Sequence, residues 1–140
     1  MMTTSNEFTI EMEDRPGTLA KFCRALADRR VNIVAMQSFP SNGKSTVHIV
    51  VDDPWTTRRL LDADGLTYSE AEVVLLRLPH RPGEIAPATL RLADGNVNID
   101  YCYCGVEIAT HVPLVIFGVA DVSRALAVLG REAVASGLGR

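Results

Sequence analysis

The sequence lacks a membrane-spanning run and lacks an excess of basic residues. No apolar stretch reaches the roughly 18 residues that a spanning helix needs. The first residues, MMTTSNEF, contain neither the charged region nor the apolar core of a secretion signal. We therefore expect a cytoplasmic protein that does not bind membranes. With 14 Lys and Arg against 17 Asp and Glu, the formal net charge is −3, which disfavours binding to nucleic acid and other polyanions.

Cysteine is scarce as well, with three residues in 140. An odd count without regular spacing argues against a disulfide framework and fits a reducing compartment. Cys102 and Cys104 lie two apart in an expected strand, so their side chains share a face and do not bridge comfortably. With His111 they could offer soft metal ligands, but a closed tetrahedral site needs four. We expect ordinary strand cysteines, no metal site and no cofactor.

Sequence motifs of catalysis are also missing. There is no nucleophile elbow, no phosphate-binding loop and no zinc-ligating His-Glu pair. The adjacent carboxylates of Asp52 and Asp53 are better explained by the start of a helix. We therefore expect no catalytic residues and do not expect an enzyme. The composition, with 47% hydrophobic and 22% charged residues, is typical of a folded globular chain.

One segment of the chain occurs twice. The stretch DRPGTLAKFCRALADRRVNI at 14–33 resembles HRPGEIAPATLRLADGNVNI at 80–99, and an offset of 82 − 16 = 66 aligns Pro16 with Pro82. A shared offset indicates duplication, and two copies are too few for a solenoid. We therefore expect two small domains, 6–71 and 72–140, that pack on each other. The same offset also aligns Gly17 with Gly83, Leu26 with Leu92, Asp28 with Asp94 and Asn32 with Asn98.

The first copy shows the periodicities of strands and helices in turn. Residues 7–12 alternate apolar and polar side chains as a half-buried strand does. Asn42-Gly43 is a strong hairpin-turn signal between two further strands, and Asp53 is a candidate N-cap for a second helix. Residues 66–79 close this copy and open the next. The apolar stripe of the first helix, at i, i+3, i+4 and i+7, is Leu19, Phe22, Cys23 and Leu26.

This order predicts an α+β fold. It consists of two ferredoxin-like βαββαβ units in tandem, with antiparallel sheets and both helices of a unit on one face. The second copy runs out after a helix at 121–135, so we expect it to lack its last strand or to share a sheet with its neighbour. Pro87 stands where the first copy has Lys21, and it would remove a helical hydrogen bond. We therefore expect the helix of the second copy to begin late.

The outer face of the first sheet carries two further expectations. His48 alternates with Val47 and Ile49, which predicts that its ring lies on the outer surface. Val50 would be an apolar residue on a face that no helix covers. Because such a face is protected in a dimer, we expect a homodimer.

The repeated motifs resemble a known family. A strand ending in x-R-P-G, then an amphipathic helix, then V-N-I entering the next strand, resembles the ACT domain, and two in tandem resemble the small stand-alone tandem ACT proteins. The resemblance covers nearly the whole chain. It implies a regulatory module that binds an amino acid or related small molecule where two units pack side by side, and it implies a client enzyme or transporter as partner.

The resemblance also implies ligand contacts from the residue before R-P-G, from the Asn of V-N-I and from the loop backbone. Arg15 and Arg81 themselves are expected to have solvated or paired side chains. If the units pack about a pseudo-two-fold axis, each pocket takes its loop from one copy and its Asn from the other. The ligand-binding residues so implied are Asp14, Arg15, Pro16, Gly17, Thr18, Leu19, Asn32, Ile33, His80, Gly83, Glu84, Ile85, Asn98 and Ile99.

The chemistry of these residues suits an amino acid. A Gly at a helix start lets a ligand approach backbone N–H groups, which together with the helix dipole favour a carboxylate. An Asn supplies both a donor and an acceptor, as a zwitterion requires. Asp14 suits an α-ammonium group, whereas His80 offers a neutral or cationic ring, so the two sites are expected to differ.

Each motif also has a plain structural interpretation. R-P-G is equally typical of a turn before a helix, and V-N-I of a helix exit. The occurrence of both motifs in both copies favours ligand binding at one interface at least. Our first hypothesis is a non-catalytic amino-acid-binding regulator. The alternative is a pure interaction module, or a regulatory subunit of an enzyme of amino-acid metabolism, with degenerate pockets.

Overall fold

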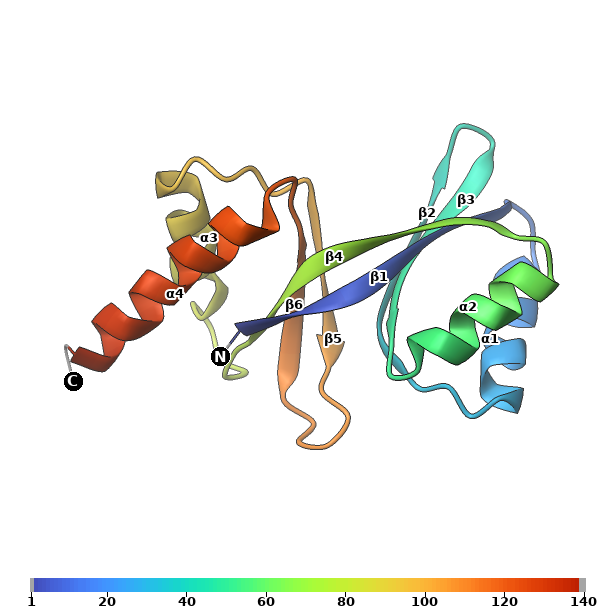
Figure 1. Cartoon of the computed structure of the whole chain (residues 1–140), viewed down its shortest axis with the longest axis horizontal. Helices are drawn as coiled ribbons and strands as arrows, with labels where there is room; N and C mark the ends of the chain where they lie inside the picture. The colour runs from blue at the N-terminus through green and yellow to red at the C-terminus, as the bar shows by residue number, and fades with distance from the viewer. Residues whose placement is uncertain (1, 139–140) are drawn as a thin grey trace. The chain divides into compact units, whose positions relative to one another are not determined.

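The computed structural model describes residues 2–138, with side chains up to Gly130. Strands and helices alternate as predicted, and the fold is α+β with antiparallel strands (Figure 1). No helix among the described residues is long and apolar enough to span a membrane. The elements are β1 (Met2–Glu13), α1 (Thr18–Asp28), β2 (Ile33–Ser41), β3 (Lys44–Val51), α2 (Pro54–Ala63), β4 (Thr67–Arg77), α3 (Ile85–Asp94), β5 (Tyr101–Val106), β6 (Pro113–Gly118) and α4 (Val122–Leu138).

The chain divides into two compact units. The first unit is Asn6–Ala71, and the second unit joins Met2–Ser5 to the residues from Glu72 onward. One boundary falls inside β4, so residues of this strand belong to both units. The other boundary falls inside β1, which the sequence does not predict.

The sheet of the first unit is built on β3. This strand pairs antiparallel with β1 on one side and with β2 on the other, and Ile49 lies opposite both Phe8 and Met36. The predicted β2–β3 hairpin turn is confirmed. Asn42 and Gly43 have φ angles of 53° and 79°, the positive values that a tight two-residue hairpin turn requires.

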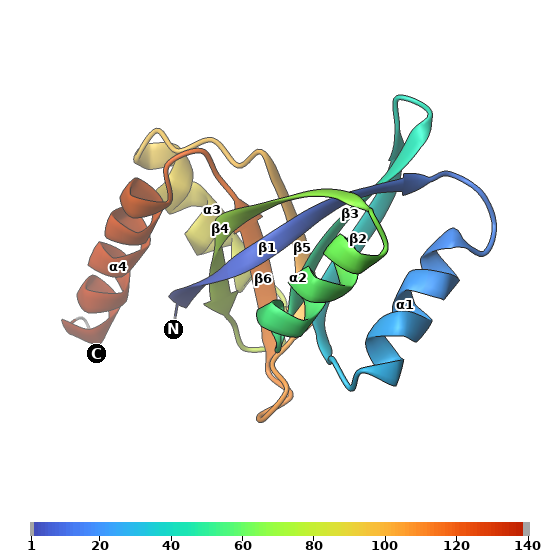
Figure 2. The same ribbon diagram turned by 45° about the vertical axis from the view of Figure 1, so that its right-hand side comes forward.

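Helices α1 and α2 cover one face of these strands and share a core with them (Figure 2). From α1 the fully buried members are Phe22 and Leu26, which lie on the predicted stripe. The start of α2 is also as predicted, because the Oδ1 atom of Asp53 accepts a hydrogen bond from the backbone N–H of Thr56 at 3.0 Å. The strands contribute the inward-facing residues Phe8, Ile10, Met12, Val47, Ile49 and Val51.

The second unit repeats this arrangement with β4, β5 and β6. Strand β6 pairs antiparallel with both neighbours, and its Phe117 lies opposite Val74 of β4 and Cys102 of β5. Helices α3 and α4 pack on the buried face and approach each other closely at Gly95, where an added Cβ would lie 2.6 Å from a methyl group of Val128.

The sequence leaves two possibilities for the last strand of the second unit, its loss or a sheet shared with the neighbouring unit. No strand follows α4 in the described part of the chain, but Met2–Ser5 belongs to this unit, and Met2 packs against its core. Strands β1 and β4 run side by side in opposite directions in both views (Figures 1 and 2). The strand therefore comes from the beginning of the chain.

Pro87 delays α3 by one position. Helix α1 begins at Thr18 and α3 at Ile85, and the repeat offset of 66 would place the start at Glu84. Pro87 lies in the first turn of α3, where a backbone N–H has no partner within the helix. The predicted late start is therefore correct in direction but small.

The prediction of an exposed outer face at His48 and Val50 is wrong. Val50 is 1% exposed and His48 is 7% exposed, with the Nδ1 atom of His48 3.0 Å from the Oγ1 atom of Thr9 and 3.3 Å from the Oε1 atom of Glu7. The alternation was assigned correctly, but β3 is buried on both faces from Val47 to its end. Val50 therefore gives no support for a homodimer, which stays a prediction.

Candidate ligand site

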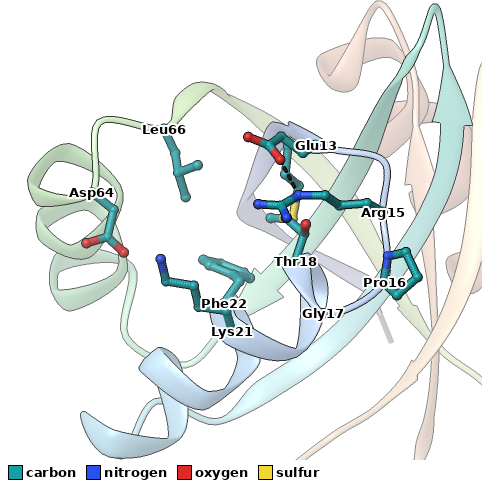
Figure 3. Close-up of a pocket in the computed structure, with 10 residues that line it drawn as sticks. Glu13, Arg15, Pro16, Gly17, Thr18, Lys21, Phe22, Asp64 and Leu66 are labelled. Atoms are coloured by element: carbon teal, nitrogen blue, oxygen red, sulfur yellow. Dashed lines mark hydrogen bonds and ion pairs between the residues drawn. The ribbon is translucent and has the colours of Figure 1, made fainter.

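A cavity of about 490 Å³ opens beside the β1–α1 loop of the first unit (Figure 3). This volume lies within the range of about 300–1,000 Å³ that is usual for small-molecule sites. Its walls come from the end of β1, from the first turns of α1 and from the turn that follows α2. The lining residues are Met12, Glu13, Arg15, Pro16, Gly17, Thr18, Lys21, Phe22, Asp64 and Leu66.

The loop presents backbone groups to the cavity. Gly17 precedes α1 with φ 93°, a backbone conformation that L side chains rarely adopt, and an added Cβ there would meet no atom within 4 Å. No side chain in the described part of the chain caps this helix. The backbone N–H of Thr18 donates to the carbonyl oxygen of Arg15 at 3.4 Å, and the next N–H groups of the helix start lack intrahelical partners, so this helix end has donors to offer a ligand oxygen.

The floor of the cavity is apolar. Met12 and Phe22 are each 4% exposed and belong to the core of the first unit, and the half-buried Leu66 packs against the same core. Leu66 and Phe22 point toward the space between α1 and the turn after α2 (Figure 3). Because these side chains are fixed by core packing, the floor is a preformed apolar surface.

Four charged side chains line the rim. Glu13 and Arg15 form an ion pair with each other. Lys21, from α1, and Asp64, from the end of α2, face each other across the cavity (Figure 3). Neither of these two forms an ion pair with any described residue. The rim therefore offers one positive and one negative group that the protein leaves unpaired.

Part of the cavity lining coincides with the residues predicted from the sequence. The structure places four predicted residues, 15–18, in the cavity lining, and Arg15 is paired as expected. Asp14 is exposed in the same loop but does not line the cavity, and Leu19 is a half-buried residue packed against the core. Lys21 and Asp64 were missed. Lys21 follows Gly17 by one helical turn, which is a usable signal, whereas Asp64 lies far along the sequence.

Asn32 and Ile33 lie at the other end of the first unit. Glu13 pairs with Lys44 near the cavity, and Ile33 pairs with Val51 at the opposite end of the sheet. Helix α1 lies between the two motifs, and its 11 residues span about 16 Å. The structure therefore does not bring Asn32 to the cavity beside Gly17. The pairing of motifs from different copies stays a prediction.

The matching loop of the second unit borders a more open cavity of similar volume, about 490 Å³. Its only predicted lining residue is Gly83, whose φ of 86° matches that of Gly17. Pro87, at the position of Lys21, removes both a cation and a backbone donor. The other lining residues are Ala86, Leu90, Arg91 and Asp94.

The remaining predicted residues of the second copy do not line either cavity. Glu84 forms an ion pair with Arg81, which is therefore paired as expected. His80 is exposed, and Ile85 is 40% exposed on α3. The Nδ2 atom of Asn98 donates to the Oδ1 atom of Asp100 at 2.8 Å, and Ile99 packs against the core of the second unit.

The cysteines do not gather with other metal ligands. Cys102 and Cys104 are exposed on one face of β5, opposite Phe117 and Val115 of β6. His111 lies in the β5–β6 connection with φ 60°. No group of three or more His, Cys, Asp or Glu side chains among the described residues could hold a metal ion.

Residues 7–54 match the ACT domain family. No curated protein matches the chain. A crystal structure of a protein from Bacteroides thetaiotaomicron aligns with 94% of this chain and 90% of its own, with a TM-score of 0.83 and 20% identity. The ligand-free regulatory subunit of aspartate kinase from Thermus thermophilus aligns over 94% of both chains, with a TM-score of 0.64 and 18% identity. The aspartate kinase regulatory subunit from Thermus flavus also aligns over 94% of both chains, with a TM-score of 0.55 and 18% identity. These similarities show a common fold.

Proposed function

We propose, from the match of residues 7–54 to the ACT domain family, that the protein is a non-catalytic regulator that binds an amino acid in the cavity of its first unit. Two of the structures that share its fold are regulatory subunits of aspartate kinases. In those proteins this architecture serves regulation, which supports the same role here.

The observation that carries the proposal is the uncapped start of α1 at the cavity. Gly17 leaves the backbone open, and the first N–H groups of the helix have no side-chain partner among the described residues. These donors and the positive end of the helix dipole favour an α-carboxylate. The cavity volume of about 490 Å³ is ample for one amino acid.

As a regulator, the protein acts on a client enzyme or transporter. A ligand shifts a client only if it binds the active and inactive assemblies with different affinities. The α1 start is a suitable place for such a difference, because a bound carboxylate would add contacts to the loop that joins β1 to α1.

The second candidate function is an interaction module with degenerate pockets. The second unit favours it, because Pro87 stands where the matching helix has Lys21 and its cavity is more open. Such a module would bind its client without an amino acid.

A thermal-shift screen over the twenty amino acids separates the two functions. A ligand at 100 times its Kd stabilises the folded state by about 2.7 kcal/mol, which is readily seen as a higher unfolding temperature. Thr18→Trp would fill the cavity and abolish the shift, whereas Thr67→Trp, at an exposed position outside it, would preserve the shift. A screen in which no amino acid raises the unfolding temperature overturns the proposed function and leaves the interaction module.

A further inference from the structure

We infer that the ligand of the first-unit cavity is a neutral α-amino acid with a medium-sized apolar side chain, held by Lys21 at its carboxylate and by Asp64 at its ammonium group. This inference rests on the proposed function and names the chemical class of its ligand. It is carried by the charges on the rim, the surface of the floor and the comparison with the second unit.

The rim of the cavity is electrically balanced but incompletely paired. Glu13 and Arg15 neutralise each other, and Lys21 and Asp64 point toward one another without an ion pair to any described residue (Figure 3). A zwitterion supplies the missing negative and positive groups in the matching order. An acidic or basic amino acid would bring a further charge for which the rim has no free partner.

The floor decides where the ligand side chain goes. Below the rim, the surface consists of Met12, Phe22 and Leu66. A polar side chain placed on these groups would lose its hydration without gaining a hydrogen bond, whereas an apolar one would gain by leaving water. Leucine, isoleucine and methionine have suitable side chains.

The second unit lacks the pair formed by Lys21 and Asp64. Its α3 has Pro87 at the position of Lys21, and the two charged residues that line its cavity, Arg91 and Asp94, both come from the later part of α3. The Lys21–Asp64 pair therefore belongs to the first unit and is not a general feature of the repeat.

The test is isothermal titration calorimetry of the full chain with leucine, leucinamide and N-acetylleucine. Leucinamide lacks the carboxylate, and N-acetylleucine lacks the ammonium charge. An exposed ion pair contributes up to about 1 kcal/mol, which corresponds to about fivefold in affinity. On the natural chain we expect each derivative to bind about fivefold more weakly than leucine.

Two variants assign each charge to its partner. Lys21→Met should bind leucine as weakly as the natural chain binds leucinamide, and it should bind N-acetylleucine more weakly still. Asp64→Asn should bind leucine as weakly as the natural chain binds N-acetylleucine, and it should bind leucinamide more weakly still. Lys44→Met and Asp28→Asn remove exposed charges outside the cavity and serve as matched controls that should bind leucine normally.

The outcomes separate this inference from the proposed function. Tighter binding of glutamate or lysine than of leucine overturns the ligand class and leaves the function standing. Unchanged leucine binding by Lys21→Met and Asp64→Asn overturns the assignment of the carboxylate to Lys21 and of the ammonium group to Asp64. If no amino acid binds at all, the proposed function and this inference both fail.

Discussion

The backbone N–H of Asn32 donates to the Oδ1 atom of Asp52 at 2.8 Å, and the backbone N–H of Asp52 donates to the carbonyl oxygen of Asn32 at 3.1 Å. This reciprocal pair joins the start of β2 to the connection between β3 and α2. It gives the V-N-I motif of the first copy a structural role in its own unit, at the end of the sheet away from the cavity.

Asp52→Ala should therefore destabilise the protein without affecting its ligand. Removing the carboxylate leaves the N–H of Asn32 without this acceptor, and a hydrogen bond of this kind contributes about 1 kcal/mol. Urea unfolding should show a loss of that size, and Asp52→Asn, which keeps an acceptor oxygen, should lose less. A weaker affinity for leucine in either variant would contradict the conclusion that the Asn32–Asp52 pair lies at the end of the sheet away from the cavity.

Gly17 and Gly95 should respond to alanine for different reasons. Gly17 has φ 93° and open space, so Gly17→Ala should cost about 1–2 kcal/mol of backbone strain. At Gly95 the new Cβ would meet the stiff side chain of Val128 at 2.6 Å, and overpacking costs about 1–3 kcal/mol. Adding Val128→Ala should therefore recover part of the stability lost in Gly95→Ala, as measured by urea unfolding. No recovery would show that the loss at Gly95 is not steric.

The two loops should bind ligand unequally. Lys21 in the first unit is replaced by Pro87 in the second, and the second cavity is more open. Calorimetry with leucine should give one strong site per chain, or one strong and one weak site. Gly17→Ala should weaken the strong site, and Gly83→Ala should leave it unchanged. Two equal and independent sites would contradict this prediction.

Local signals predicted the elements well. Asp53 and Pro54 mark the start of α2 because an acceptor side chain and a preset φ act within one helical turn. Asn42-Gly43 marks the β2–β3 turn because few residues accept its positive φ angles. These constraints act between neighbours in sequence, so one chain is enough to find them.

What the sequence could not predict depends on contacts between distant residues. Alternation placed His48 opposite Val47, but it could not say that this face would be buried too. The motif indicated the loop at Gly17, whereas Asp64 joins the cavity only because α2 ends beside α1. Met2–Ser5 completes a unit whose other residues begin at Glu72, and no local pattern contains that information.

The three cysteines should react at different rates. Cys102 and Cys104 are exposed on β5, whereas Cys23 is half-buried in α1, where burial raises the pKa of its thiol. Because the thiolate is the nucleophile, a raised pKa and restricted access both slow alkylation. Iodoacetamide at neutral pH, followed by peptide mass spectrometry, should label Cys102 and Cys104 well before Cys23. Early labelling of Cys23 would show that α1 opens readily from the core.

Acid should weaken the second unit through Glu107. The Nε atom of Arg77 donates to the Oε2 atom of Glu107 at 2.7 Å, and the hydroxyl of Thr110 donates to the same oxygen at 2.7 Å. Arg77 first, and then Thr110, lower the pKa of Glu107 below its ordinary value of 4.5. The unfolded chain therefore takes up this proton at a higher pH than the folded chain does.

The sign of the effect follows from that difference in proton uptake. The stabilisation is complete above the unfolded pKa, and it is lost as the pH falls from about 4.5 through the lower folded value. Glu107→Gln should thus reduce stability at pH 7, and its difference from the natural chain should shrink as the pH falls below about 4.5. Thermal unfolding between neutral and acid pH measures this, with Glu72→Gln, an exposed carboxylate without an ion pair to any described residue, as control. A Glu107→Gln difference that stays constant with pH would show that the Arg77 pair does not stabilise the fold through its charge.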